Sequence, residues 1–506
     1  MCFNKAERGK LVMRRNKRSS SAFHSSEIGK LIDQCCKSAD FVTFQLKDSP
    51  FFISYFQTLV DKKVLHRDIL TILKDKQFIS LEDMKHAIQV EDLVLTTELS
   101  SVKQKLMQGN IIIYQQEAQP SCLLIPAFLQ ENRQVSIPET EYSVVGPKEA
   151  FVESLDTNIN LVRKRIPVPE FQIKEFSVGK LSKTRVAVAY IEGIADEENV
   201  NTVIQRITDI GYDQIIDSSF INQMIADNKN SPFPQLVDTE RPDRVASVLM
   251  EGKVAILVDG SPSAITGPAT LGEFFSAFED YVTVWNIASA FRLIRFLAIT
   301  FSVLSTPLYV AVLTYHYEMI PQDLLTTLIS SRAGIPFPPL LEAIILEWTI
   351  ELLREAGARL PTKVGQTIGI VGGIVIGTAA VQAGLTSNVL LIVVALSALA
   401  SFTTPVYQVS NAIRLIRFPF LIFAQLLGLL GVAACTAIVV AHLLKLKSLG
   451  RPFLEPVYPI RLKDMKDALI RLPFNQQTSR PLQTRTDNKI KFRPHSSPPD
   501  KQDIDE

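Results

Sequence analysis

Four glutamates in one otherwise apolar segment are the residues of this chain whose type and spacing could do chemistry. They lie within residues 338–356 and are Glu342, Glu347, Glu351 and Glu355. At about 100° per residue, the last three fall within about 80° of one another on a helix, with Arg354 on the same face. An ionised carboxylate facing lipid is costly. Two interpretations stay open: the helix lies in a membrane interface or re-enters it, or it presents carboxylates to water in a cavity or oligomeric pore.

No other motif points to catalysis or to a bound cofactor. The patterns GxxxxGK[ST], HExxH and GxSxG are missing. The five cysteines form no CxxC pair, so neither a zinc site nor a disulfide framework is indicated. No basic patch is interleaved with aromatic residues, which argues against nucleic acid as a partner. We therefore expect no enzyme activity, no metal and no cofactor.

The element that carries the glutamates belongs to a region of long apolar stretches. These stretches are 296–314, 367–385, 388–406 and 418–443. Each is close to or above the roughly 20 residues that cross a bilayer as a helix. Arg292 and Arg295 precede the first stretch, which favours a cytoplasmic position for everything before it. The number of spans stays open, because Arg414 and Arg417 favour five, whereas the basic residues from Lys445 onward favour four.

Glycine recurs at every fourth position around the second stretch, at Gly365, Gly369, Gly373 and Gly377. This spacing places four bare backbones on one helix face. Within lipid, such a face permits close helix packing, inside the chain or between subunits. Flexibility or a water-lined path is the alternative interpretation.

The region before the membrane stretches holds a duplication. Strand-like runs at 51–61 and 185–196 both end in Asp, and each is followed later by a helix that ends in Gly and leads into a strand. The glycines are Gly109 and Gly252, a residue type that tolerates the left-handed geometry after a helix. The sequence therefore predicts two related α/β lobes, with chance similarity of short apolar strings as the alternative interpretation.

A turn in the second lobe is a candidate for lobe contacts or coupling. It consists of Asp259, Gly260, Ser261 and Pro262, a composition typical of a tight turn. Asp259 could bind a cation or accept a proton there, although a capped turn is the simpler interpretation. Glu153 and Arg163 lie on a predicted charge-balanced helix, and we add them to the same set of candidates.

These observations give a fold class: an α/β soluble region of two related lobes followed by an all-α polytopic membrane domain. The predicted domains are a basic, Ser-rich, disordered start at 1–24, lobes at 25–135 and 136–290, a membrane domain at 291–447 and a polar tail at 448–506. The tail becomes proline-rich and charged, which predicts disorder from about residue 475.

Several strings together resemble the A subunit of GerA-type spore germination receptors. They occur at 146–155, 190–196, 239–243, 258–262, 292–296, 315–321, 351–357 and 411–419. The resemblance runs from about 140 to about 480 and is weaker over the first lobe, where it is mainly a match of pattern.

The resemblance implies an integral protein of the inner membrane of a bacterial endospore, with both lobes facing the spore core. It implies three kinds of protein partner: further copies of the chain, a transporter-like B subunit that binds the nutrient, and a lipoprotein C subunit. A ring of A subunits would conduct monovalent cations across the lipid when opened. A non-conducting scaffold that couples the partner subunits is the alternative, and a secondary transporter is disfavoured because no set of spans is repeated.

Overall fold

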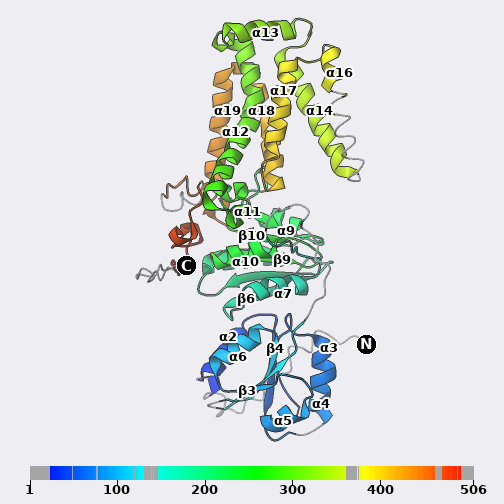
Figure 1. Ribbon diagram of the computed structural model, residues 1–506, viewed down its shortest axis with the longest axis vertical. Helices are drawn as coiled ribbons and strands as arrows, with labels where there is room; N and C mark the ends of the chain where they lie inside the picture. The colour runs from blue at the N-terminus through cyan, green and yellow to red at the C-terminus, as the bar shows by residue number, and fades with distance from the viewer. Residues whose placement is uncertain are drawn as a thin grey trace, which may run out of the picture.

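The computed structural model describes residues 23–24, 26–47, 49–75, 78–117, 120–129, 138, 141, 146–360, 373, 375, 377–461, 470–486 and 488–491. These residues form three tiers: a first lobe, a second lobe and a helical part (Figure 1). The chain passes through the tiers in order, and its C-terminal segment then returns to the second lobe.

The first lobe is one antiparallel sheet with helices on both faces. Its elements are α2 (Glu27–Cys35), β1 (Phe41–Gln45), β2 (Phe51–Phe56), α3 (Lys62–Val64), η1 (Leu65–Leu70), α4 (Thr71–Asp75), α5 (Leu81–Ala87), β3 (Val94–Thr96), α6 (Leu99–Met107), β4 (Asn110–Gln115) and β5 (Cys122–Pro126). Side chains of β4 alternate between the faces: Ile111 and Ile113 pack under η1, α4 and α5, whereas Ile112 and Tyr114 pack under α2 and α6. Each face therefore has its own apolar core.

The second lobe repeats this plan. Its elements are α7 (Leu155–Arg165), β6 (Phe171–Val178), β7 (Thr184–Ile191), α8 (Glu197–Thr208), α9 (Ser218–Ile225), β8 (Val237–Thr239), α10 (Pro242–Met250), β9 (Val254–Val258) and β10 (Ala264–Gly267). Helices α7 and α10 cover one face of its sheet, and α8 and α9 cover the other.

The two sheets confirm the predicted duplication. Their strand orders are β1-β2-β4-β5-β3 and β6-β7-β9-β10-β8, which are the same order when the five strands of each lobe are numbered from its start. Gly109 ends α6 and Gly252 ends α10, with φ of 89° and 95°, before the equivalent strands β4 and β9. The local pattern of helix, glycine and strand therefore marked equivalent joints.

The helical part begins at the end of the second lobe. Its elements are η2 (Leu271–Phe275), α11 (Glu279–Val282), α12 (Trp285–Tyr315), η3 (Tyr317–Met319), α13 (Gln322–Arg332), α14 (Pro339–Arg359), α16 (Gly377–Gln382), α17 (Asn388–Ser401), α18 (Tyr407–Leu427) and α19 (Leu429–Lys445). Helices α12 and α18 are long and apolar enough to cross a bilayer, and α17 and α19 are shorter apolar helices. Helix α13 lies across the end of the bundle farthest from the lobes (Figure 1).

Two predicted stretches differ from the observed helices. The stretch 418–443 is divided by Gly428, whose φ of 60° ends α18 and lets α19 start in a new direction. The stretch 388–406 ends as a helix at Ser401, because Pro405 follows and the chain turns into α18. Much of the stretch 367–385 lies outside the described residues.

The C-terminal segment differs from the prediction of disorder from about residue 475 over residues 475–486 and 488–491, whereas residues 492–506 lie outside the described residues. It contains β11 (Lys447–Ser448), β12 (Arg451–Pro452), η5 (Phe474–Gln476) and η6 (Leu482–Thr484). Arg480 donates to the carbonyl of Met250, and Lys491 lies 3.1 Å from Glu251, so this polar segment is held by α10. The contacts of this segment with the folded second lobe order it, although its polar and proline-rich composition favours disorder.

Candidate functional site

The contact between the lobes is built around a buried ion pair. Arg163 of α7 binds Asp40 through two bonds of 2.8 Å, and neither side chain is more than 1% exposed. The guanidinium also lies over the rings of Phe56 and Phe171, at 4.2 and 4.8 Å from their centroids. A planar, bidentate and stacked arginine of this kind fixes orientation as well as distance.

Hydrogen bonds around this pair extend the contact between lobes. Thr58 of the first lobe donates to Asp40 at 2.8 Å, and the amide of Asn160 donates to the carbonyl of Thr58. The backbone N–H of Ala39 donates to the carbonyl of Ile173 at 2.8 Å. Both lobes therefore contribute backbone and side-chain groups, which resists sliding of one lobe over the other.

The turn after β9 holds the start of the helix that carries Arg163. The Asp259 carboxylate accepts from the N–H of Leu155 at 3.1 Å, and Gly260 N–H donates to the carbonyl of Glu153 at 2.7 Å. Ser261 donates to Asp217 at 2.5 Å, and Pro262 completes the turn. Asp259 thus satisfies the first N–H of α7, whose N-cap is Ser154, and Glu153 acts through its backbone. A role of this turn in coupling stays a prediction.

A second buried cluster joins α11, which follows the second lobe, to α12. Asp280 is 4% exposed and lies 3.1 Å from both Arg292 and Arg295. Arg295 also donates to the carbonyl of Phe275 at 2.5 Å. Sequence reasoning used the two arginines only for orientation and missed Asp280. The sequence did contain a signal for this cluster. Asp280 precedes Arg292 and Arg295, which are three positions apart and therefore share a helix face.

The segment after α19 adds a further connection. Arg451 lies 2.7 Å from Asp196 and 2.8 Å from Glu198, both at the start of α8. Arg471 donates to the backbone carbonyl of Tyr281 at 3.1 Å, and its own carbonyl accepts from Ser289 of α12. The second lobe is therefore attached to the helical part at both ends of that part.

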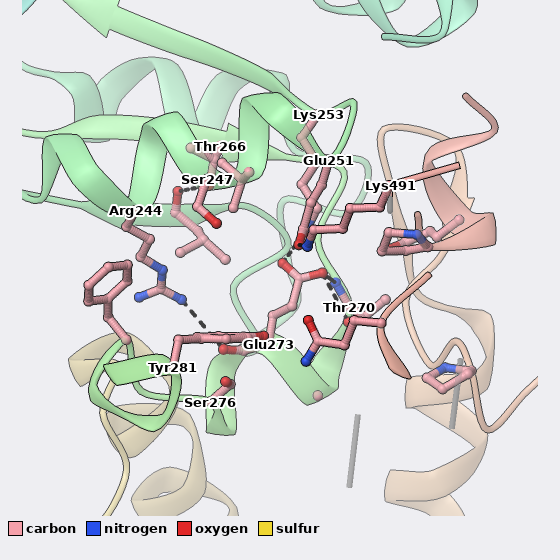
Figure 2. Close-up of a pocket in the computed structure, with 18 of the residues that line it drawn as sticks. Arg244, Ser247, Glu251, Lys253, Thr266, Thr270, Glu273, Ser276, Tyr281 and Lys491 are labelled. Atoms are coloured by element: carbon pink, nitrogen blue, oxygen red, sulfur yellow. Dashed lines mark hydrogen bonds and ion pairs between the residues drawn. The ribbon is translucent and has the colours of Figure 1, made fainter. Parts of the chain in front are cut away.

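A cavity of about 190 Å³ lies where α10, η2, α11 and the C-terminal segment meet. Figure 2 shows Glu273 in its centre, beside Lys253 and Thr270, with Lys491 and Glu251 together at one edge. Arg244 also lines the cavity and pairs with Glu141 at 2.6 Å. Each of these basic side chains has a carboxylate partner, so the lining of the cavity has no excess of one charge that would favour an anionic or a cationic ligand.

The four glutamates of α14 all meet arginines. The more deeply placed pair is buried: Glu342 lies 2.9 Å from Arg332, and Glu347 is bonded to Arg417. Their side chains are 1% and 2% exposed. Thr306 of α12 donates to Glu347 at 3.0 Å. Within the single chain these two carboxylates do not face water, so a water-facing role for them stays a prediction.

The other two glutamates are increasingly open to solvent. Glu351 lies 2.9 Å from Arg414 and 3.4 Å from Arg354, and its side chain is 29% exposed. Glu355 pairs with Arg359 of the same helix and is 66% exposed. Exposure thus increases along α14 toward its C-terminal end. The sequence predicted that three of the four share a face, but it did not identify the arginines of α18.

The described glycines of the predicted packing face have open surroundings. A Cβ at Gly373 would meet nothing within 4 Å among the described residues, and one at Gly377 would lie 3.7 Å from Leu391. Gly365 and Gly369 lie outside the described residues. Close packing between subunits at this face stays a prediction.

Two buried cysteine thiols are poor nucleophiles at neutral pH. Burial raises the pKa of the Cys35 and Cys122 thiols to about 12, so both are protonated at neutral pH. Across the ranges that the structure describes, no three His, Cys, Asp or Glu side chains gather as a metal site would require.

Comparison with known proteins places these features in context. Residues 26–483 match the family model described as Bacillus/Clostridium GerA spore germination protein. The chain is 53% identical over 460 residues to spore germination protein GerQA of Bacillus cereus, covering 90% of this chain and 92% of that one. It is 37% identical over 441 residues to spore germination protein A1 of Bacillus subtilis, covering 87% and 91%.

A solved structure is also similar to part of the chain. It is the N-terminal domain of the A subunit of the Bacillus megaterium spore germinant receptor GerK3, with 24% identity and a TM-score of 0.35. The match covers 49% of this chain and 95% of the solved one.

Proposed function

The chain belongs to the GerA family of spore germination proteins, and on that premise we propose that it is the A subunit of a nutrient-responsive germination receptor. It oligomerises in the inner membrane of the spore, with its lobes toward the spore core. It forms or gates a path for monovalent cations when nutrient binds the receptor. A transporter-like B subunit supplies the nutrient site, and a lipoprotein C subunit completes the complex.

The observation that carries this proposal is the charged helix α14 inside an apolar helical bundle. Ionisable groups within membrane segments are costly and usually mark an ion or proton pathway. Glu347 and Glu351 bind arginines of α18, a helix long enough to cross the bilayer. Glu351 and Glu355 are partly open to solvent, so carboxylates are within reach of a wet path.

Coupling would follow the buried joints between tiers. The Arg163–Asp40 pair joins the lobes, and the Asp280 cluster joins α11, which follows the second lobe, to α12. Nutrient binding in the partner subunit favours one arrangement of these parts, and the population shifts toward the conducting arrangement. Such a shift needs a nutrient that binds the two arrangements with different affinity.

The experiment is a potassium-flux measurement with purified A, B and C subunits in liposomes. We expect flux only when nutrient and all three subunits are present. Glu351→Gln should change the rate or selectivity of flux without lowering the amount of complex, with Asp213→Asn on an exposed lobe surface as the matched control. Absence of nutrient-dependent flux from intact complexes would contradict the proposal.

A non-conducting scaffold is the second candidate, and the burial of Glu342 and Glu347 favours it. Both carboxylates are satisfied inside the single chain, so they do not require a pore. A scaffold predicts that complexes assemble and bind nutrient, while Glu351→Gln leaves cation release unchanged.

A further inference from the structure

We propose that the Glu347–Arg417 pair is a latch that holds α14 against α12 and α18 and that opens only as water enters. This inference rests on the proposed function, because it assigns the resting state of the same cation path to one ion pair. The latch makes Arg417 and Thr306 positioning residues rather than groups that contact the ion.

The latch joins three helices at one point. Glu347 comes from α14, Arg417 from α18, and Thr306 and Ser302 from α12. Thr306 donates to one carboxylate oxygen of Glu347, Arg417 donates to the other, and Arg417 also donates to Ser302 at 2.7 Å. Arg292 and Arg295 of α12 bind Asp280 of α11, just after the second lobe, so one helix runs from that joint to the latch.

The surroundings make the latch a two-state device. Glu347 and Arg417 are each 2% exposed, so separating them without water would leave two unpaired charges in a dry interior. In the dry state each charge is compensated by the other, and in a hydrated state each is compensated by water. Any arrangement in which the two charges are separated without water is unfavourable. The Nε of Arg417 is buried and has no hydrogen-bond partner among the described residues, so it is a donor that entering water can satisfy.

Helix α14 is the element that can move. Its outer face is exposed along Leu341, Ile345, Trp348 and Leu352, so no described part of the chain covers it. Its C-terminal end points toward the second lobe, and the exposed Glu355 lies at that end (Figure 1). Among the described residues the row of glutamates is therefore open at Glu355 and closed at Glu347.

The first test measures access of water to the covered face of α14. Ala343 is fully buried beside the latch, and Ala343→Cys in a chain without its native cysteines reports access to a small water-soluble methanethiosulfonate cation. The full chain is used in membranes with its B and C subunits. We expect Glu347→Gln and Arg417→Gln each to raise the labelling rate at least about tenfold without nutrient. Asp213→Asn, which breaks an exposed pair with Lys180 on the second lobe, should leave the rate unchanged.

Paired substitutions keep the test decisive if a single variant fails to fold. Exchange of the charges, Glu347→Arg with Arg417→Glu, should restore protection of the cysteine and its exposure on addition of nutrient. Glu347→Met with Arg417→Met fills the site without charge, so the cysteine should stay protected even with nutrient. A structural pair with no latch role predicts that the methionine pair responds to nutrient like the unchanged chain, and that result would overturn the proposal.

Potassium flux in the same membranes separates the latch from the proposed function. If the labelling rate of Ala343→Cys changes in the latch variants as expected but no potassium flux is observed, the latch is supported and the cation path is contradicted. If Ala343→Cys stays protected in the chains that carry Glu347→Gln or Arg417→Gln, the latch is overturned, whether or not nutrient-dependent flux is observed.

Discussion

Arg163 of the second lobe and Asp40 of the first form a bidentate ion pair at 2.8 Å, closed off from solvent between the rings of Phe56 and Phe171. The two residues are 123 positions apart in the chain. Among the ion pairs between tiers that the described residues form, this pair is the most deeply buried, so we expect the arrangement of the lobes to depend on it.

Asp40→Ala should lower the free energy of unfolding by roughly 3–5 kcal/mol, because it leaves the Arg163 guanidinium buried without a counter-ion. Denaturant unfolding of the purified chain measures this. The control is Glu192→Gln, which removes a solvent-exposed pair with Lys37 across the same lobe contact and should cost less than about 1 kcal/mol. Equal effects of the two substitutions would contradict a special role for the buried pair.

Asp280→Asn should loosen the joint between α11, directly after the second lobe, and α12. It removes a carboxylate that both Arg292 and Arg295 bind, in a site where Asp280 is 4% exposed. We expect faster protease cleavage between residues 276 and 292 with the lobes still folded. Asp213→Asn, at an exposed pair with Lys180, is the matched control and should leave the cleavage rate unchanged.

Asp238 should make stability fall as the pH rises. Burial in β8 raises the pKa of its carboxyl to about 6, although Ser263 partly opposes the shift. The folded chain therefore holds this proton more tightly than the unfolded chain, whose carboxyl has an ordinary pKa near 4. The contribution is present below about pH 4 and is lost as the pH rises through about 6.

Asp238→Asn is the corresponding test. It should stabilise the chain at pH 7 by up to about 3 kcal/mol and flatten its stability between pH 4 and 6. Thermal unfolding across this range measures both effects. A steeper dependence in the variant would show that the carboxyl has another partner.

Gly252→Ala should destabilise the second lobe more than Gly193→Ala does. Both glycines have positive φ, of 95° and 77°, so alanine pays a backbone penalty of roughly 1–2 kcal/mol at either position. At Gly252 the new Cβ would also lie 2.2 Å from Thr486 and 3.0 Å from the carbonyl of Ile194, whereas at Gly193 it meets nothing within 4 Å. Similar losses of stability would mean that the C-terminal segment yields easily at Thr486.

The duplicated lobes were predictable because their joints are local. A helix that ends at Gly109 or Gly252 and leads into an apolar strand is visible within a dozen residues, and the two sheets follow from that order. The division of the stretch 418–443 was not predictable from hydropathy, because Gly428 reverses the chain without interrupting the apolar run.

The candidate site was predictable only in part. The spacing of the glutamates showed that α14 carries charge among apolar residues, which is a local property. Their partners are distant: Glu347 and Arg417 lie 70 positions apart. Nothing in one sequence shows which of several arginines a buried carboxylate selects, so the pairing comes from the tertiary structure.

The return of the chain from α19 to the second lobe has a mechanical consequence. Asp280 joins α12 to α11 directly after the second lobe, and Arg451 in the strand after α19 binds Asp196 at the start of α8, so the bundle is attached to the second lobe at two points. With a single attachment point, the bundle could rotate freely when the second lobe twists, and the twist would not reach the helices. Two anchors convert that twist into opposed displacements of α12 and α19, so torque applied to the lobes reaches the helices.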